Sequence, residues 1–316
     1  MKLFIKWTTF VLIVAATMAL SACTHEPPEA TDVEYNLILV YGDGRENKTT
    51  TYKPGDTITV EVPEREGYEF VGWCTDAKLN NFHDFSKGVS GDVTLYAKWD
   101  IDYKHLLSRV SSEAQLASVK VVTPATASIF STSKQGSGVI YKNESNYWYA
   151  LTNNHVVTLN NGKTGAPFVY DAFGNEYQAT VIKSDAAYDL AVIRFYVPSG
   201  RELAVANVLD RIPNKDETVV TVSAPNGKFN TVELARVVWY NELDENSSSQ
   251  ELSDVNFKVL WLLGNADHGS SGGAVYDKDL NLVGVIYGVA TAKENNESHV
   301  LAVPSVKILE FISDAE

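Results

Sequence analysis

The sequence predicts a mainly β protein with two folded regions, the second of which ends in a helix. Three observations point to this class. Short alternating apolar segments separated by Gly, Pro and Asp recur between residues 33 and 99. Similar segments recur from residue 119 to residue 302, and Pro304–Ile312 has apolar residues at helical spacing after a proline. A chain of 316 residues also fits about two domains.

The composition is that of a soluble, acidic protein with an ordinary apolar core. Hydrophobic residues make up 45% and charged residues 21%, and the formal net charge is −14. Removal of residues 1–22, which contain two lysines and no Asp or Glu, would make the charge −16. Such acidity disfavours binding to nucleic acid or to anionic lipid. We therefore expect no nucleic-acid partner.

The N-terminus has the pattern of an export signal. Lys2 and Lys6 precede the apolar run Phe10–Leu20, whose 11 residues are fewer than the roughly 20 needed to span a bilayer. The run ends in Leu-Ser-Ala-Cys at 20–23, which resembles the lipobox of bacterial lipoproteins. The resemblance implies a lipoprotein signal peptide over 1–22, lipidation of Cys23 and a linker over 23–32; the alternative is an ordinary secretory cleavage site. We expect an extracytoplasmic protein, lipid-anchored to a bacterial membrane or cell surface.

The cysteines and histidines give no sign of cross-linking or of a metal site. The chain has two cysteines, Cys23 and Cys74, so a lipidated Cys23 leaves no intramolecular disulfide. The six histidines lack the spacing to Cys or acidic residues that a zinc site needs. We therefore expect neither a metal nor a cofactor.

Residues 33–99 form the first expected domain, with strands at Leu37–Tyr41, Thr49–Tyr52 and Thr57–Val62. The motifs GYEFVGW at 67–73 and DVTLYAKW at 92–99 resemble one internalin B-repeat-like (Listeria–Bacteroides repeat) module. That resemblance implies a small β-grasp-like domain used as a spacer or an adhesive module. Its aromatic residues could form a ligand platform, but we expect them to pack in the core; they are Tyr68, Phe70, Trp73, Tyr96 and Trp99.

Residues 100–117 are expected to form a helical connector, because Leu106, Val110 and Ala114 recur near helical spacing. The remainder, residues 118–316, is expected to be built from short strands. These are Lys120–Val122, Ser137–Tyr141, Trp148–Thr152, Ala179–Lys183, Leu190–Phe195, Thr218–Ser223, Val232–Tyr240, Phe257–Leu262, Gly273–Tyr276, Leu282–Tyr287 and Val300–Ala302.

Three motifs in this region together point to nucleophilic catalysis. They are TNNHVV at 152–157, SDAAYDLAV at 184–192 and GSSGG at 269–273. A serine hydroxyl needs a base to become a nucleophile, and the base needs a carboxylate to orient it. With GSGVI at 136–140, the motifs resemble the trypsin-like (chymotrypsin-fold) serine proteases of the bacterial HtrA type. The resemblance implies a double β-barrel domain over 118–316.

The resemblance assigns roles by motif position. Ser271 matches the nucleophile, His155 the general base and Asp189 the carboxylate, while the N–H groups of Gly269 and Ser271 match the oxyanion hole. The chain departs from the family at Ser270, where Asn or Asp is common, and at His268, which is a weaker candidate for the base. We also expect no PDZ-like domain after the terminal helix, unlike many HtrA-type relatives.

The substrate pocket is expected to be uncharged. Relatives that cut after Arg or Lys have Asp six residues before the nucleophile, and here that position is Asn265. The segment Val285–Gly288, which includes Ile286, offers an apolar wall. We therefore expect a small or apolar residue before the cleaved bond.

The sequence thus predicts a membrane-anchored extracytoplasmic serine endopeptidase that cleaves proteins or peptides through an acyl-enzyme. The alternative is a non-catalytic surface lipoprotein in which the repeat module binds a partner and the protease fold is a scaffold. The sequence does not indicate an oligomeric state.

Overall fold

The computed structural model describes residues 33–88, 90–125, 133–242, 247–249, 255–292 and 297–313. The expected signal peptide, Cys23 and the linker over 23–32 lie outside these residues. The chain divides into two compact units, Met1–Glu64 with Phe70–Trp99, and Arg65–Glu69 with Asp100–Glu316. No helix in the described ranges is long and apolar enough to cross a bilayer.

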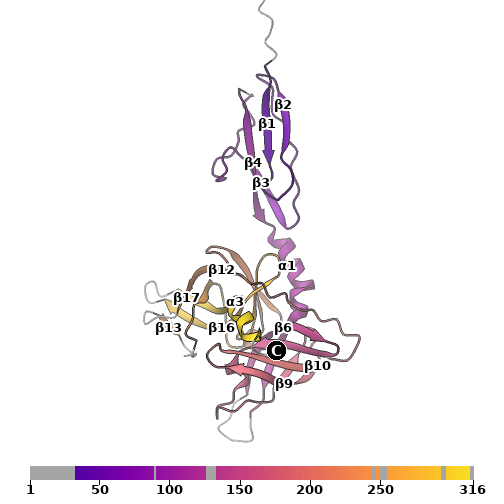
Figure 1. Cartoon of the computed structure of the whole chain (residues 1–316), viewed down its shortest axis with the longest axis vertical. Helices are drawn as coiled ribbons and strands as arrows, with labels where there is room; N and C mark the ends of the chain where they lie inside the picture. Colours follow the sequence, from indigo (N-terminus) through magenta and orange to yellow (C-terminus); the bar gives the residue numbers. More distant parts are fainter. Residues whose placement is uncertain are drawn as a thin grey trace, which may run out of the picture. The chain divides into compact units, whose positions relative to one another are not determined.

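The first unit is a four-stranded sheet (Figure 1). Its strands are β1 (Tyr35–Val40), β2 (Lys48–Tyr52), β3 (Tyr68–Cys74) and β4 (Val93–Ile101), in the order β2-β1-β4-β3. Strand β1 is antiparallel to β2 and parallel to β4. The expected strand at Thr57–Val62 is wrong: the segment turns Ile58 into the core, but its backbone joins no strand.

Three of the five aromatic residues expected in the core of the first unit, Phe70, Trp73 and Trp99, pack there, whereas Tyr68 lines a hollow of the second unit. Trp73 is 3% exposed, and the Phe70 ring meets Trp73 and Trp99 edge to face at 5.4 Å in each case. Trp99 also donates from Nε1 to the carbonyl of Tyr41 at 2.7 Å. These rings are therefore used for packing, and an aromatic ligand platform built from Phe70, Trp73 and Trp99 has no support.

The helix expected between the two regions is present as α1 (Tyr103–Ser112), followed by the 3-10 turn η1 (Ala114–Ala117). The Asp102 carboxylate caps α1 by accepting from the N–H of His105 at 2.9 Å. Leu106 and Val110, four residues apart, are both buried. The helix therefore docks on the second unit through one apolar face.

The first barrel is closed and six-stranded. Its strands are β5 (Ser118–Thr123), β6 (Lys134–Glu144), β7 (Tyr147–Thr152), β8 (Phe168–Tyr170), β9 (Glu176–Asp185) and β10 (Leu190–Tyr196). They close in the order β10-β7-β6-β5-β8-β9. The interior is apolar and includes Val121, Ile140, Ala150, Val169 and Ile193. A single helical turn, α2 (Asn154–Val157), follows β7.

The second barrel also closes. Its elements are β11 (Thr218–Ser223), the turn η2 (Pro225–Gly227), β12 (Thr231–Asn241), β13 (Ser247–Ser249), β14 (Val259–Leu263), β15 (Ala274–Tyr276), β16 (Leu282–Ala292) and β17 (Glu297–Pro304). Strands β16-β15-β11-β12-β14-β17 form the ring through the β16–β17 pairing, and β13 adds to β16. This confirms the predicted double barrel.

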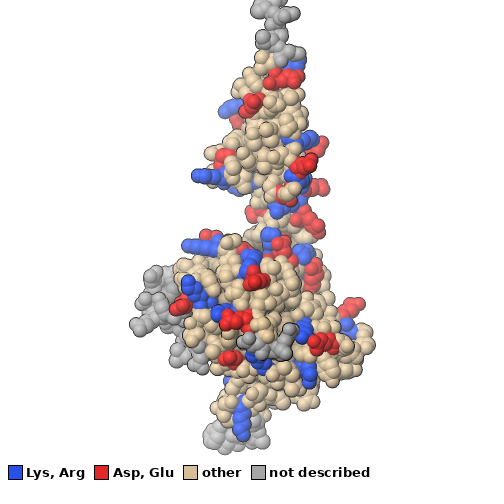
Figure 2. Space-filling view, in the orientation of Figure 1, with Lys and Arg blue, Asp and Glu red and all other residues tan. Residues whose placement is uncertain are grey.

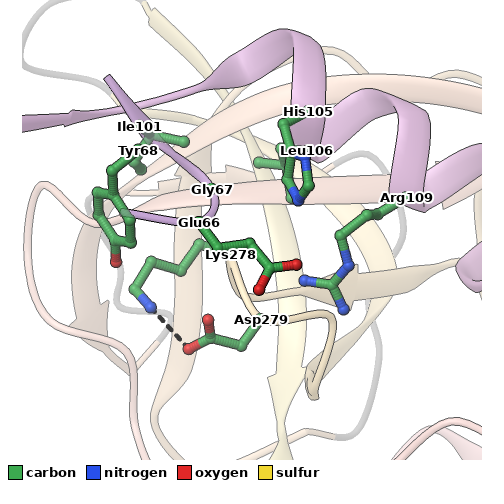
Figure 3. A pocket seen from close by; sticks show the side chains of 9 residues that line it. All are labelled: Glu66, Gly67, Tyr68, Ile101, His105, Leu106, Arg109, Lys278 and Asp279. Carbon is green, nitrogen blue, oxygen red and sulfur yellow. Dashed lines mark hydrogen bonds and ion pairs between the residues drawn. The ribbon is translucent and has the colours of Figure 1, made fainter. Parts of the chain in front are cut away.

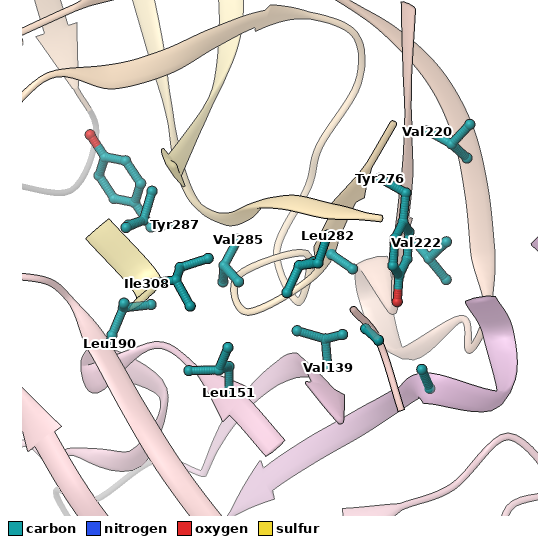
Figure 4. Close-up of a cluster of buried hydrophobic side chains, with 14 of the residues drawn as sticks. Val139, Leu151, Leu190, Val220, Val222, Tyr276, Leu282, Val285, Tyr287 and Ile308 are labelled. Atoms are coloured by element: carbon teal, nitrogen blue, oxygen red, sulfur yellow. The ribbon is translucent and has the colours of Figure 1, made fainter. Parts of the chain in front are cut away.

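The largest apolar cluster lies where the two barrels meet (Figure 4). Val139, Leu151 and Leu190 come from the first barrel, and Tyr276 and Val285 come from the second. Helix α3 (Ser305–Ser313) adds Ile308 and Phe311, both fully buried. The helix begins one residue later than expected, because Pro304 is the last residue of β17. Because both barrels share this cluster, the groove between them rests on a packed base.

Charges on the face shown in Figure 2 are interspersed rather than gathered by sign. Several are paired on the surface, such as Arg236 with Asp216 at 2.8 Å. Within the described residues, no three His, Cys, Asp or Glu side chains are grouped to hold a metal ion.

Candidate active site

His155 and Asp189 are joined by two hydrogen bonds. His155 lies in α2, immediately after β7, and Asp189 precedes β10, the strand that pairs with β7. The backbone N–H of His155 donates to Oδ1 of Asp189 at 3.0 Å, and Nδ1 of the imidazole lies 2.8 Å from Oδ2. The Asp189 side chain is 5% exposed. Because a carboxylate only accepts, Nδ1 carries the proton and Nε2 is the basic nitrogen.

A third residue, Asn153, holds the backbone of Asp189 in place. Asp189 has a positive φ of 46°, a conformation that few non-glycine residues adopt. The amide of Asn153, which is fully buried, donates to the carbonyl of Asp189 at 2.8 Å. The Asn153 side chain therefore ties the start of the histidine turn to the aspartate backbone.

Ser271 lies in the loop between β14 and β15, and two glycines set the path of this loop. Gly269 and Gly272 have φ values of 96° and 86°. A Cβ on Gly269 would lie 2.5 Å from the Ala224 carbonyl oxygen, and one on Gly272 would lie 2.0 Å from the Ser137 carbonyl oxygen. Only glycine fits either position without movement of the backbone.

The carbonyls of residues 268–271 all have partners. His268 accepts from Asn226 N–H at 2.6 Å, Gly269 from the Ser137 hydroxyl at 2.7 Å, Ser270 from Gly273 N–H at 2.8 Å and Ser271 from Ser137 N–H at 2.6 Å. Ser270 and Gly272 also donate, to Asp267 and Ile286. Among the described residues, the N–H groups of Gly269 and Ser271 have no protein acceptor. Two N–H groups two residues apart, in a loop with a positive φ, suit a negatively charged oxygen.

His155, Gly269 and Ser271 line one groove of about 780 Å³. Its wall also includes Lys134, Gln135, Val156, Asn226, Ala266, Asp267, His268, Gly288, Val289, Thr291 and Ser298. The volume is that of a small-molecule or peptide side-chain site. The structure therefore brings His155, Asp189, Ser271 and Gly269 to one place.

The residues expected for the substrate pocket are elsewhere. Ile286 is 1% exposed and packs inside the second barrel, while the Asn265 amide donates to Glu233 at 2.8 Å. A register shift in β16 between Ile286 and Gly288 breaks the alternation of faces, so that Gly288 and Val289 line the groove. The expectation that Ile286 and Asn265 line the pocket is therefore corrected. The wall that replaces them still includes the uncharged residues Ala266, Val289 and Thr291.

Ser270 and His268, which flank Gly269 in the sequence, differ in whether they face the groove. Ser270 is 2% exposed and its hydroxyl accepts from Asp267 N–H at 3.1 Å, so it faces away from the groove. His268 does line the groove. Its backbone N–H donates to the Asp267 carboxylate at 2.7 Å, and this bond, with one from the Asn226 amide, lowers the pKa of Asp267. Asp267 is therefore ionised, and its carboxylate holds the loop by accepting from the His268 N–H and the Asn226 amide.

A second hollow in the same unit, of about 380 Å³, lacks comparable chemistry (Figure 3). Lys278 is paired with Asp279 at 2.7 Å, and Arg109 is paired with Glu113 at 3.0 Å. The side chains that line it include His105 but no serine or cysteine. It therefore offers no serine or cysteine nucleophile beside the histidine.

The sequence did not single out three residues that build the site. Ser137, Asn153 and Asn226 each contact the loop or the aspartate, and none was given a role. Ser137 and Asn153 lie inside recognised motifs, which is the one signal available for them. The partner of the Ser137 hydroxyl is 132 residues away in the chain, so local spacing does not reveal the contact.

Two closed barrels that hold a histidine–aspartate pair and a glycine-rich serine loop on one groove have the architecture of the trypsin-like serine proteases. Residues 136–285 match the family model of the trypsin-like peptidase domain. Residues 35–98 match that of the Listeria-Bacteroides repeat domain.

Individual relatives agree with these matches. The serine protease Do-like HtrA of Bacillus subtilis is 31% identical over 178 residues, which are 55% of this chain and 37% of that protein. A protein of Evansella cellulosilytica named as a Gly-rich membrane protein is 35% identical over 88 residues, 27% of this chain and 10% of that protein. The chain thus spans less than half the length of the curated relatives it matches.

Solved structures share the fold. The crystal structure of the Rv3671c protease of M. tuberculosis, in its active form, aligns with a TM-score of 0.53 and 20% identity. The alignment covers 67% of this chain and 86% of that chain. At this identity the likeness establishes the fold alone.

Proposed function

We propose that this protein is a serine endopeptidase that cleaves peptide bonds of proteins or peptides through an acyl-enzyme. The observation that carries the proposal is the pair of hydrogen bonds between His155 and Asp189, on a groove that also holds Ser271 and two N–H groups without acceptors. The match to the trypsin-like peptidase domain and the HtrA-type relatives supports the same reaction.

In this proposal Ser271 is the nucleophile. His155 takes the hydroxyl proton at Nε2 while the Ser271 oxygen attacks the substrate carbonyl, and later gives that proton to the leaving amine. Asp189 keeps Nδ1 protonated and stabilises the imidazolium through Oδ2, which lies 2.8 Å from Nδ1. Its Oδ1 accepts from the backbone N–H of His155 and so holds the carboxylate in place. Water then repeats the sequence on the acyl-enzyme and releases the second product.

The N–H groups of Gly269 and Ser271 act as the oxyanion hole of this mechanism. The tetrahedral intermediate carries a negative oxygen, and donors fixed before the reaction stabilise it more than donors that must reorganise. The His268 carbonyl supports this assignment, because it accepts from Asn226 N–H at 2.6 Å and from neither of the two donors. A loop in this state has its donors ready without substrate.

We further propose that the protein acts outside the cytoplasm, held by a lipid on Cys23. The support is the lipobox-like Leu-Ser-Ala-Cys at 20–23, the bacterial surface repeat over 35–98 and relatives named as membrane proteins. Replacement of Cys23 by alanine should move the protein from the membrane fraction to the soluble extracytoplasmic fraction. Unchanged membrane association would refute the anchor.

A fluorophosphonate probe tests the catalytic proposal. The serine oxygen attacks phosphorus, fluoride leaves, and the hydroxyl proton passes to the base. We expect wild-type protein from residue 24 onward to be labelled, Ser271→Ala and His155→Ala not to be labelled, and Ser270→Ala to be labelled like wild type. Labelling lost in Ser270→Ala and retained in Ser271→Ala would overturn the assignment. Absence of labelling in folded wild type would favour the non-catalytic scaffold.

A further inference from the structure

We propose that Ser137 is a positioning residue for the oxyanion donors, through its side chain as well as its backbone. This inference rests on the proposed peptidase function. Ser137 lies on β6 of the first barrel and is 1% exposed, whereas Gly269, Ser271 and Ala224 belong to the second barrel. One buried residue of the first barrel therefore contacts the loop of the second barrel that presents both donors.

The direction of the Ser137 hydroxyl bonds is fixed by its partners. Its Oγ lies 2.8 Å from the backbone nitrogen of Ala224, which can only donate, and 2.7 Å from the carbonyl oxygen of Gly269, which can only accept. The hydroxyl proton therefore points to Gly269. Both bonds are buried, so no bulk water is at hand to replace either one.

The backbone of Ser137 holds the loop at a second point. Its N–H donates to the Ser271 carbonyl at 2.6 Å, and its own carbonyl accepts from the Thr152 hydroxyl at 2.7 Å. Thr152 ends β7, three residues before His155. Ser137 thus connects the strand that leads to the base with the loop that carries the nucleophile.

The peptide unit that the hydroxyl holds lies between the two donor units. Gly269 N–H belongs to the unit before it and Ser271 N–H to the unit after it. If the Gly269 carbonyl loses its partner, rotation of this unit turns both neighbouring N–H groups away from a common point. The loss should therefore affect charge stabilisation in the transition state and leave the His155–Asp189 pair intact.

The test compares Ser137→Ala with Ser118→Ala in fluorophosphonate labelling rates. Ser118 is a matched control, since it lies in the same barrel, is 4% exposed and donates a buried hydrogen bond to the Ala114 carbonyl at 3.2 Å. We expect Ser137→Ala to be labelled at least about tenfold more slowly, and Ser118→Ala to be labelled at the wild-type rate. The pH profile of the labelling rate should keep its wild-type midpoint while its plateau falls.

Ser137→Cys covers the case of a misfolded alanine variant, because its larger side chain leaves no cavity and keeps a weak donor. Its rate should lie between those of wild type and Ser137→Ala. A wild-type plateau in Ser137→Ala, or in Ser137→Cys where the alanine variant does not fold, would overturn this inference and leave the peptidase proposal standing. A shifted midpoint would also overturn it, since the base would then be affected. No labelling of folded wild type would instead overturn the proposed function and this inference with it.

Discussion

Replacement of Gly272 by alanine should destabilise the second unit and abolish fluorophosphonate labelling. Gly272 has φ of 86°, and an added Cβ would lie 2.0 Å from the Ser137 carbonyl oxygen and 2.7 Å from Thr152 Oγ1. The left-handed conformation costs an alanine about 1–2 kcal/mol. The overlap requires a backbone shift, for which overpacking costs about 1–3 kcal/mol more. We therefore expect a loss of about 2–5 kcal/mol in the free energy of unfolding.

Gly174→Ala separates the two contributions. Gly174 has a similar φ of 81°, but nothing lies within 4 Å of an added Cβ. Gly174→Ala should lower the free energy of unfolding by about 1–2 kcal/mol and leave labelling unchanged. Urea denaturation measures both variants, and the difference between them is the cost of the overlap. Equal losses in the two variants, or a labelled Gly272→Ala, would refute the close approach of this loop to β6.

Three further predictions concern other parts of the second unit. Asp189→Asn keeps the side-chain volume but loses the charge, and should slow labelling by about 10⁴-fold with a wild-type circular dichroism spectrum; a loss under tenfold would contradict its role. Burial and the hydrogen bond to Asp171 raise the pKa of Tyr177 to about 12. The neutral phenol therefore contributes stability that is complete below about pH 10 and is lost towards pH 12, and Tyr177→Phe should flatten this loss in a pH series of denaturation curves. Arg211 lies 3.1 Å from Asp277, whose side chain is 2% exposed, so Arg211→Met should destabilise the protein by about 2–3 kcal/mol in urea, and adding Asp277→Asn should restore most of it.

The sequence predicted those features that depend on local pattern. Alternating apolar residues located most strands of both barrels, and the order of the three motifs indicated the fold before any contact was known. The segment Thr57–Val62 shows the limit of this method, because alternation can be satisfied by Ile58 facing the core without a partner strand. Strand pairing depends on two segments, so the alternating pattern of one segment does not predict it.

The site was predictable only where motifs mark it. His155, Asp189 and Ser271 stand in recognisable motifs and meet in one region of the fold. The wall of the groove was not predictable, because a register shift in β16 determines which residues face it and leaves Ile286 inside the barrel. The contacts of Ser137 were hidden for another reason: they join positions far apart in the chain.

The sequence separation between Ser137 and Gly269 also affects the order in which the parts of the site form during folding. The bond between them closes a loop of 132 residues, and the two residues belong to different barrels. Contacts of such long range form late, since the chain entropy lost in closing the loop must be offset by packing already in place. A chain with one finished barrel would hold His155 and Asp189 but lack the donor loop. Incompletely folded molecules would therefore lack a complete site and could not cleave their neighbours while the chain folds.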